Sequence, residues 1–174
     1  MEFISFAIHF AALVFLTVII GGLMNYFMNK NGFAYNPYLT YLLFPAVVVA
    51  LYLVGGFSMW TVKGIVFFLI LIYASVQDLS EHQADDFLWV MLLILSLVNI
   101  EKVGITSMIF GALAVFLPQF IVVMFFKTKG QGGADFKFST SAALCIGFYG
   151  GVIGYMIGLV YHCHSYDNLP GTFL

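Results

Sequence analysis

Residues 103–126, VGITSMIFGALAVFLPQFIVVMFF, decide the fold class because the stretch is long and contains no charged side chain. An α-helix needs about 20 consecutive apolar residues to cross the ~30 Å hydrocarbon core of a bilayer. Backbone N–H and C=O groups in that core must be bonded within the protein, which restricts spans to helices and closed barrels. The stretch therefore predicts a membrane-spanning helix.

The rest of the chain has a similar composition. Of its 174 residues, 63% are hydrophobic and only 8% are charged, and the mean hydropathy is +1.05. These values lie well outside those of soluble globular domains and predict an integral protein of the lipid bilayer. No linker rich in Pro, Gly or Ser divides the chain, so we expect a single domain, residues 1–174.

Five further apolar runs flank the opening stretch, with polar loops between them. We expect an all-α membrane protein with about six transmembrane helices in one bundle. The expected spans are residues 3–28, 38–57, 59–77, 87–100, 103–126 and 138–161. The fourth run is short, about 21 Å at 1.5 Å per residue, and crosses only if flanking residues reach the interface or the bilayer thins. Glycines four residues apart in the sixth run predict a closely packed helix face.

The lysines orient these spans. All six basic residues are Lys, and four of them lie on one side of the expected bundle: Lys30, Lys127, Lys129 and Lys137, against Lys63 and Lys102. Because cytoplasmic loops carry the excess of positive charge, the side with four lysines is expected to face the cytoplasm. Asp78 and Asp135 then share that side. If the fourth run did not cross, the two acids would face opposite compartments.

Several classes of function are disfavoured by the residue types present. The chain has no Arg, which argues against a nucleic-acid partner bound through guanidinium forks. Cys145 and Cys163 are the only cysteines and cannot form a Cys-x-x-Cys zinc module. His162, Cys163 and His164 would point in different directions from a helix. We expect neither a metal nor another cofactor.

Two acids stand where polar loops meet apolar runs. Asp78 closes the third run, YASVQD at 73–78, and Asp135 follows a glycine pair in GGADFK at 132–137. An acid costs about 2.5–3.5 kcal/mol at the bilayer centre and less near the interface, so one retained there is often functional. Two neighbouring carboxylates share a proton, so that one activates water while the other polarises a carbonyl. That chemistry hydrolyses a peptide bond. The alternative is that both acids cap helices or line a water-filled groove.

The surroundings of Asp135 favour such chemistry. Gly132 and Gly133 allow positive φ angles and the close approach of another chain. The helix expected after them presents unpaired N–H groups and its positive dipole end. Lys137 adds a positive charge that would favour an ionised partner.

The two loops together resemble the type IV prepilin peptidases. ASVQDL at 74–79, with Asp86 eight residues after Asp78 and an apolar helix beyond it, resembles the first family motif. GGADFK at 132–137 resembles the second motif, Gly-x-Gly-Asp-x-Lys, with Ala134 at its second glycine. The first loop also lacks the basic residues and the Ile-Pro that the family usually has before its Asn or Asp. The resemblance covers roughly residues 66–161.

The resemblance implies a GxGD-type aspartic peptidase of the inner membrane. Such an enzyme removes the short basic leader of prepilins or pseudopilins at the cytoplasmic face. The resemblance implies Asp78 and Asp135 as the catalytic pair. It implies supporting positions at Gly132, Gly133, Lys137 and Asp86. Longer members carry cysteine pairs associated with N-methylation, so we expect a peptidase without methyltransferase activity.

Other interpretations use the same acids. A transport subunit or pilus-assembly factor would use them for ions or protons, but transporters place such acids near the midplane or show repeated halves. Presenilin-like peptidases have Tyr-Asp at the first acid, whereas this chain has Gln77 before Asp78. The acids of residues 78–86 would attract a Lys-rich leader, or they form no more than a solvated acidic loop.

Overall fold

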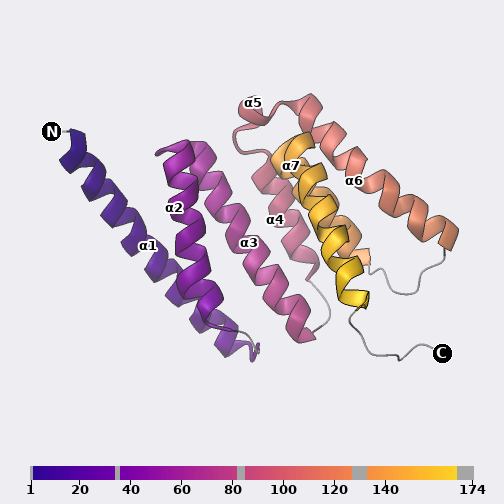
Figure 1. Ribbon diagram of the computed structural model, residues 1–174, viewed down its shortest axis with the longest axis horizontal. Coiled ribbons are helices and arrows are strands. Elements are labelled where there is room, and N and C mark those ends of the chain that lie inside the picture. The colour runs from indigo at the N-terminus through magenta and orange to yellow at the C-terminus, as the bar shows by residue number, and fades with distance from the viewer. Residues whose placement is uncertain (1, 34–35, 82–84, 127–132, 168–174) are drawn as a thin grey trace. The chain divides into compact units, whose positions relative to one another are not determined.

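The computed structural model describes residues 2–33, 36–81, 85–126 and 133–167 (Figure 1). Every regular element in these ranges is helical, which confirms the predicted fold class. The elements are α1 (Glu2–Lys30), the π-helix η1 (Leu39–Leu43), α2 (Phe44–Gly55), α3 (Met59–Glu81), α4 (Asp86–Ser96), α5 (Ile100–Val103), α6 (Ile105–Phe126) and α7 (Gly133–Asp167).

The described residues contain four helical stretches that are long and apolar enough to cross a membrane. These are Ala7–Lys30, Met59–Glu81, Ile105–Phe125 and Phe136–Val160, and they match the first, third, fifth and sixth predicted spans. Two shorter apolar helices, Thr40–Gly55 and Asp86–Ser96, occupy the second and fourth predicted spans. The chain is a multi-pass membrane protein. Which individual helices cross the bilayer, the two shorter ones included, stays a prediction.

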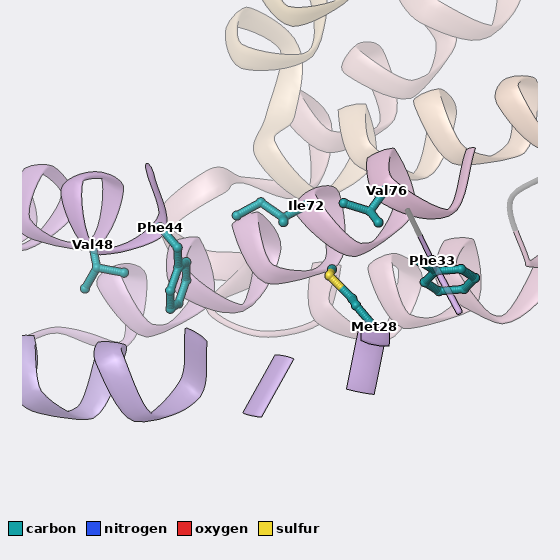
Figure 2. Packing of buried hydrophobic residues seen from close by; sticks show 6 residues of the cluster. All are labelled: Met28, Phe33, Phe44, Val48, Ile72 and Val76. Carbon is teal, nitrogen blue, oxygen red and sulfur yellow. The ribbon is translucent and has the colours of Figure 1, made fainter. Parts of the chain in front are cut away.

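The chain divides into a first unit, Met1–Leu88, and a second unit, Trp89–Leu174. In the first unit, α2 packs against both α1 and α3. Figure 2 shows the side chains that join them: Met28, Phe33, Phe44, Val48, Ile72 and Val76. Lipid tails are as apolar as these residues, so close packing rather than escape from water favours their contact. The prediction of a single domain is not tested by this division.

The second predicted span is a π-helix followed by an α-helix. The π-helix η1 ends at Leu43, and α2 has a proline, Pro45, in its first turn. Proline lacks an N–H group, and its ring clashes with the carbonyl four residues earlier. The regular hydrogen-bond ladder therefore cannot continue through Pro45, and a wider π turn precedes it.

The sixth predicted span is right in length and composition but not in path. Gly147, inside α7, has φ 84 and ψ −176, which is not helical. Residues eight apart in a straight α-helix are separated by about 12 Å. A Cβ placed on Gly151 would nevertheless lie only 2.7 Å from the Cβ of Ala143. The helix therefore folds back at Gly147 into two arms (Figure 1).

This reversal is packed closely against α6. A Cβ on Gly111 of α6 would lie 2.8 Å from the carbonyl carbon of Gly147. The N–H of Phe148, at the start of the second arm, donates a hydrogen bond to Oγ of Ser107 at 3.0 Å. The predicted close packing of glycines is confirmed at this point. Two later glycines meet no described atom within 4 Å of a built Cβ: Gly154 and Gly158.

Candidate active site

The first acid, Asp78, lies in the last turn of α3. The sequence predicted that the helix ends at Asp78, but α3 continues to Glu81. The side chain of Asp78 is exposed, whereas those of Val76 and Gln77 are 0% and 3% exposed. Neighbouring side chains on a helix point about 100° apart. Burial of the two preceding residues therefore turns Asp78 away from the packed face.

Gln77 connects the end of α3 to the chain just before α4. Its Oε1 accepts a hydrogen bond from the Asp85 N–H at 3.2 Å, and its Nε2 donates to Oε2 of Glu81 at 3.4 Å. Asp85 in turn accepts at its carbonyl from the N–H of Leu88, 3.1 Å away. The sequence motifs alone did not predict this role of Gln77. The signal that was available is an amide inside an apolar run, directly before the acid.

Asp86 is the first residue of α4, as the predicted pattern of an acid followed by a new apolar helix requires. Its side chain is exposed. A carboxylate in the first helical turn interacts favourably with the helix dipole, by about 0.3–1 kcal/mol. The ring of Phe87 lies 6.3 Å from that of Tyr73 on α3. The start of α4 is therefore held against α3 within the first unit.

The second acid, Asp135, belongs to the first turn of α7. The sequence predicted a loop as far as Lys137, but the helix begins at Gly133. The backbone of Asp135 is helical, and Gly132 lies outside the described residues. A carboxylate this near a helix N-terminus is favoured by the dipole, as expected from the sequence.

Aromatic contacts hold this first turn within the second unit. The ring of Phe136 lies 4.6 Å from that of Phe116 on α6. The ammonium of Lys137 lies 5.6 Å from the ring centroid of Trp89 on α4. An exposed cation–π contact of this kind contributes roughly 0.5–1 kcal/mol. Lys137 therefore has a position defined by α4, two residues beyond the acid.

The six predicted site residues are distributed over both units. Asp78 and Asp86 belong to the first unit, and the residues of the 132–137 motif belong to the second. Among the described residues, no group of three or more His, Cys, Asp or Glu side chains is placed to hold a metal ion. The chemistry that these helix ends offer is that of carboxylates beside a membrane.

Residues 65–163 match the model of the type IV leader peptidase family. The chain belongs to this family. The matched range contains both acid motifs and agrees closely with the 66–161 predicted from the two loops. No curated protein and no solved structure matches the chain. Membership of the type IV leader peptidase family indicates a peptidase.

Proposed function

We propose that the chain is an aspartic peptidase that removes the short basic leader of a prepilin or pseudopilin. Cleavage takes place at the cytoplasmic face of the inner membrane, between the leader and the apolar helix of the substrate. The family match carries this proposal, because the matched residues include both Asp78 and Asp135.

In the proposed reaction, Asp78 and Asp135 meet and share one proton. The ionised carboxylate takes a proton from water, whose oxygen attacks the scissile carbonyl carbon. The protonated carboxyl donates a hydrogen bond to the carbonyl oxygen as negative charge develops there. When the C–N bond breaks, a proton passes to the leaving amine, and the products are a carboxylic acid and a new N-terminus.

The location of the acids supports this substrate class. Asp78 lies one turn from the end of the apolar helix α3, and Asp135 lies in the first turn of α7. A prepilin has its scissile bond between a basic leader, which prefers water, and an apolar helix, which prefers lipid. Acids at the ends of membrane helices are at the depth where such a bond would lie.

Charge near Asp78 supports the same substrate. Four exposed acids lie at the α3–α4 connection: Asp78, Glu81, Asp85 and Asp86. No Lys or Arg occurs between the first and the last of them. Clustered charge of one sign raises the local concentration of an oppositely charged ligand. A basic leader is therefore attracted to the helix end that carries Asp78.

The test is cleavage of a peptide with a Lys-rich leader, a glycine and an apolar helix by the detergent-purified chain. Asp78→Asn and Asp135→Asn are each expected to reduce cleavage to background, because Asn can neither take nor give the proton. Glu101→Gln, which neutralises an exposed acid of α5, is the matched control and should cut normally.

Two outcomes would count against the proposal. Cleavage that survives either aspartate substitution would exclude the two-aspartate mechanism. Failure of the folded wild-type protein to cut any leader peptide would instead favour a role in pilus assembly or transport.

A further inference from the structure

We infer that Gln119 is a positioning residue that acts through Ser139 on the helical turn carrying Asp135. The inference rests on the proposed function, because it assigns Gln119 a part in the hydrolysis for which Asp135 is proposed. Gln119 is the only amide or charged side chain in α6, a helix long and apolar enough to span the membrane.

The Gln119 side chain is paired with one residue of α7. It is 3% exposed, and its Nε2 donates a hydrogen bond to Oγ of Ser139 at 2.9 Å. The same hydroxyl lies 3.1 Å from Oε1 of Gln119 and 3.3 Å from the carbonyl oxygen of Phe136, so it can donate to either. An amide buried without a partner is costly, and the bilayer core supplies no water to satisfy it. Ser139 is therefore the residue that makes Gln119 tolerable in α6.

The position of Ser139 connects this pair to Asp135. The backbone of Asp135 and that of Ser139 both belong to α7, and with 3.6 residues per turn Ser139 stands about one turn after Asp135. Phe136, next to Asp135, contacts Phe116 of α6 with ring centroids 4.6 Å apart. The turn from Asp135 to Ser139 is thus attached to α6 by one aromatic and one polar contact.

These two contacts constrain different motions. Apolar contact is non-directional and tolerates rotation or sliding of one helix on another. A hydrogen bond requires a donor–acceptor distance near 2.9 Å and a suitable angle, so it fixes the rotation and height of α7 on α6. If Gln119 only filled space, a leucine of similar size would serve equally well.

Substitutions at Gln119 and Ser139 distinguish a hydrogen-bonding role of Gln119 from a space-filling one. Gln119→Leu and Ser139→Ala each remove the hydrogen bond between Gln119 and Ser139. The double variant loses this same hydrogen bond and not a second one. Ser139→Thr keeps the hydroxyl. Thr140→Val is the matched control, because the Thr140 hydroxyl is buried and has no hydrogen-bond partner among the described residues. Two readouts are used on the full chain in detergent. One is kcat and KM for the leader peptide, and the other is amide hydrogen exchange of residues 133–140.

Each single variant is expected to lower kcat by about tenfold to a hundredfold, the range produced by small misplacements of catalytic groups. KM should stay within about twofold, because only the reacting geometry is disturbed. The double variant should be no slower than the slower single variant, and Ser139→Thr and Thr140→Val should match the wild type. Exchange at 133–140 should be faster in Gln119→Leu and Ser139→Ala.

The inference is overturned by wild-type kcat in Gln119→Leu or Ser139→Ala, or by losses that multiply in the double variant. If the wild-type protein cuts no leader peptide, the proposed function fails, and the exchange measurement decides the inference separately. Faster exchange in both single variants would then still support positioning of the turn by Gln119, whereas unchanged exchange would overturn it.

Discussion

Two glutamines share an unusual situation in this chain. Gln77 and Gln119 are each 3% exposed, and each lies in a long apolar helix. An amide is neutral, so its burial costs less than that of a charge, and it carries both donors and acceptors. Each side chain uses both properties: Gln77 with Glu81 and the Asp85 N–H, and Gln119 with Ser139. Gln77 directly precedes Asp78 in α3, and Ser139 lies about one turn after Asp135 in α7.

Gln77→Leu is expected to destabilise the protein by roughly 1–3 kcal/mol, because the Asp85 N–H loses its acceptor in a partly buried place. The measurement is thermal unfolding in detergent. Ser75→Ala is the matched control on the same helix, since among the described residues its exposed hydroxyl bonds only to the carbonyl of Leu71, one turn earlier. Equal unfolding temperatures for Gln77→Leu and the wild type would contradict the assigned role.

A second prediction concerns the charge of the acidic side chains near Asp78. Glu81→Gln combined with Asp85→Asn should raise KM for a Lys-rich leader and leave kcat unchanged, because the lost attraction acts before the chemical step. The wild-type KM should also rise with ionic strength, since the Debye length falls from about 10 Å at 0.1 M to about 3 Å at 1 M. A KM insensitive to both changes would mean that these acids are only solvated.

The helices follow from the sequence where the bilayer sets their length. Apolar runs of about 20 residues predict spans well, and α1, α3 and α6 lie where expected. Helix ends were less predictable, because hydropathy reports the surroundings of a side chain and not its backbone. Both α3 and α7 continue through polar residues beyond their apolar runs, which places Asp78 and Asp135 inside helical turns.

The reversal of α7 shows a different limit. Glycines at four-residue intervals are expected for close packing and for a break alike, so spacing alone could not identify Gly147 as the turning point. The acid motifs could be found from sequence because their residues are local. The Asp85 N–H that bonds to Gln77 and the Ser139 hydroxyl that bonds to Gln119 are eight and twenty residues away, and only the folded chain brings these groups together.

Gly147→Ala should destabilise the second unit by about 1–3 kcal/mol, because its φ and ψ fall in a region that is essentially restricted to glycine. The added Cβ would also lie 2.8 Å from both Ser107 Oγ and Val103 Cγ1. Gly154→Ala, on the second arm and with no described atom within 4 Å of the added Cβ, should be neutral or slightly stabilising. Thermal unfolding of the two variants compares them directly, and equal stability would argue against a sharp reversal at Gly147.

The proposed chemistry requires residues from both units. Asp78 belongs to the first unit and Asp135 to the second, and the family match from 65 to 163 begins in α3 and ends in α7. Between the two acids, α4 has 11 residues, about 16 Å of helix at 1.5 Å per residue. Whether the acids share one side of the membrane therefore depends on this short helix together with the turn and α5 that follow it.

We expect that the chain does return across the membrane there, so that Asp78 and Asp135 face the same compartment and can meet. In a background of Cys145→Ala and Cys163→Ala, Asp78→Cys and Asp135→Cys should each react with an impermeant maleimide only from the cytoplasmic side. When both cysteines are present, they should form a disulfide on oxidation. A disulfide forms only where the two Cα atoms lie about 4.4–6.8 Å apart, so its formation would support the proposed meeting of the two acids. Asp78→Cys with Glu101→Cys is the control pair and should not cross-link, since Glu101 follows α4 and is expected on the opposite side if α4 crosses. Labelling of the two acids' positions from opposite sides would exclude a shared site, and with it the two-aspartate mechanism.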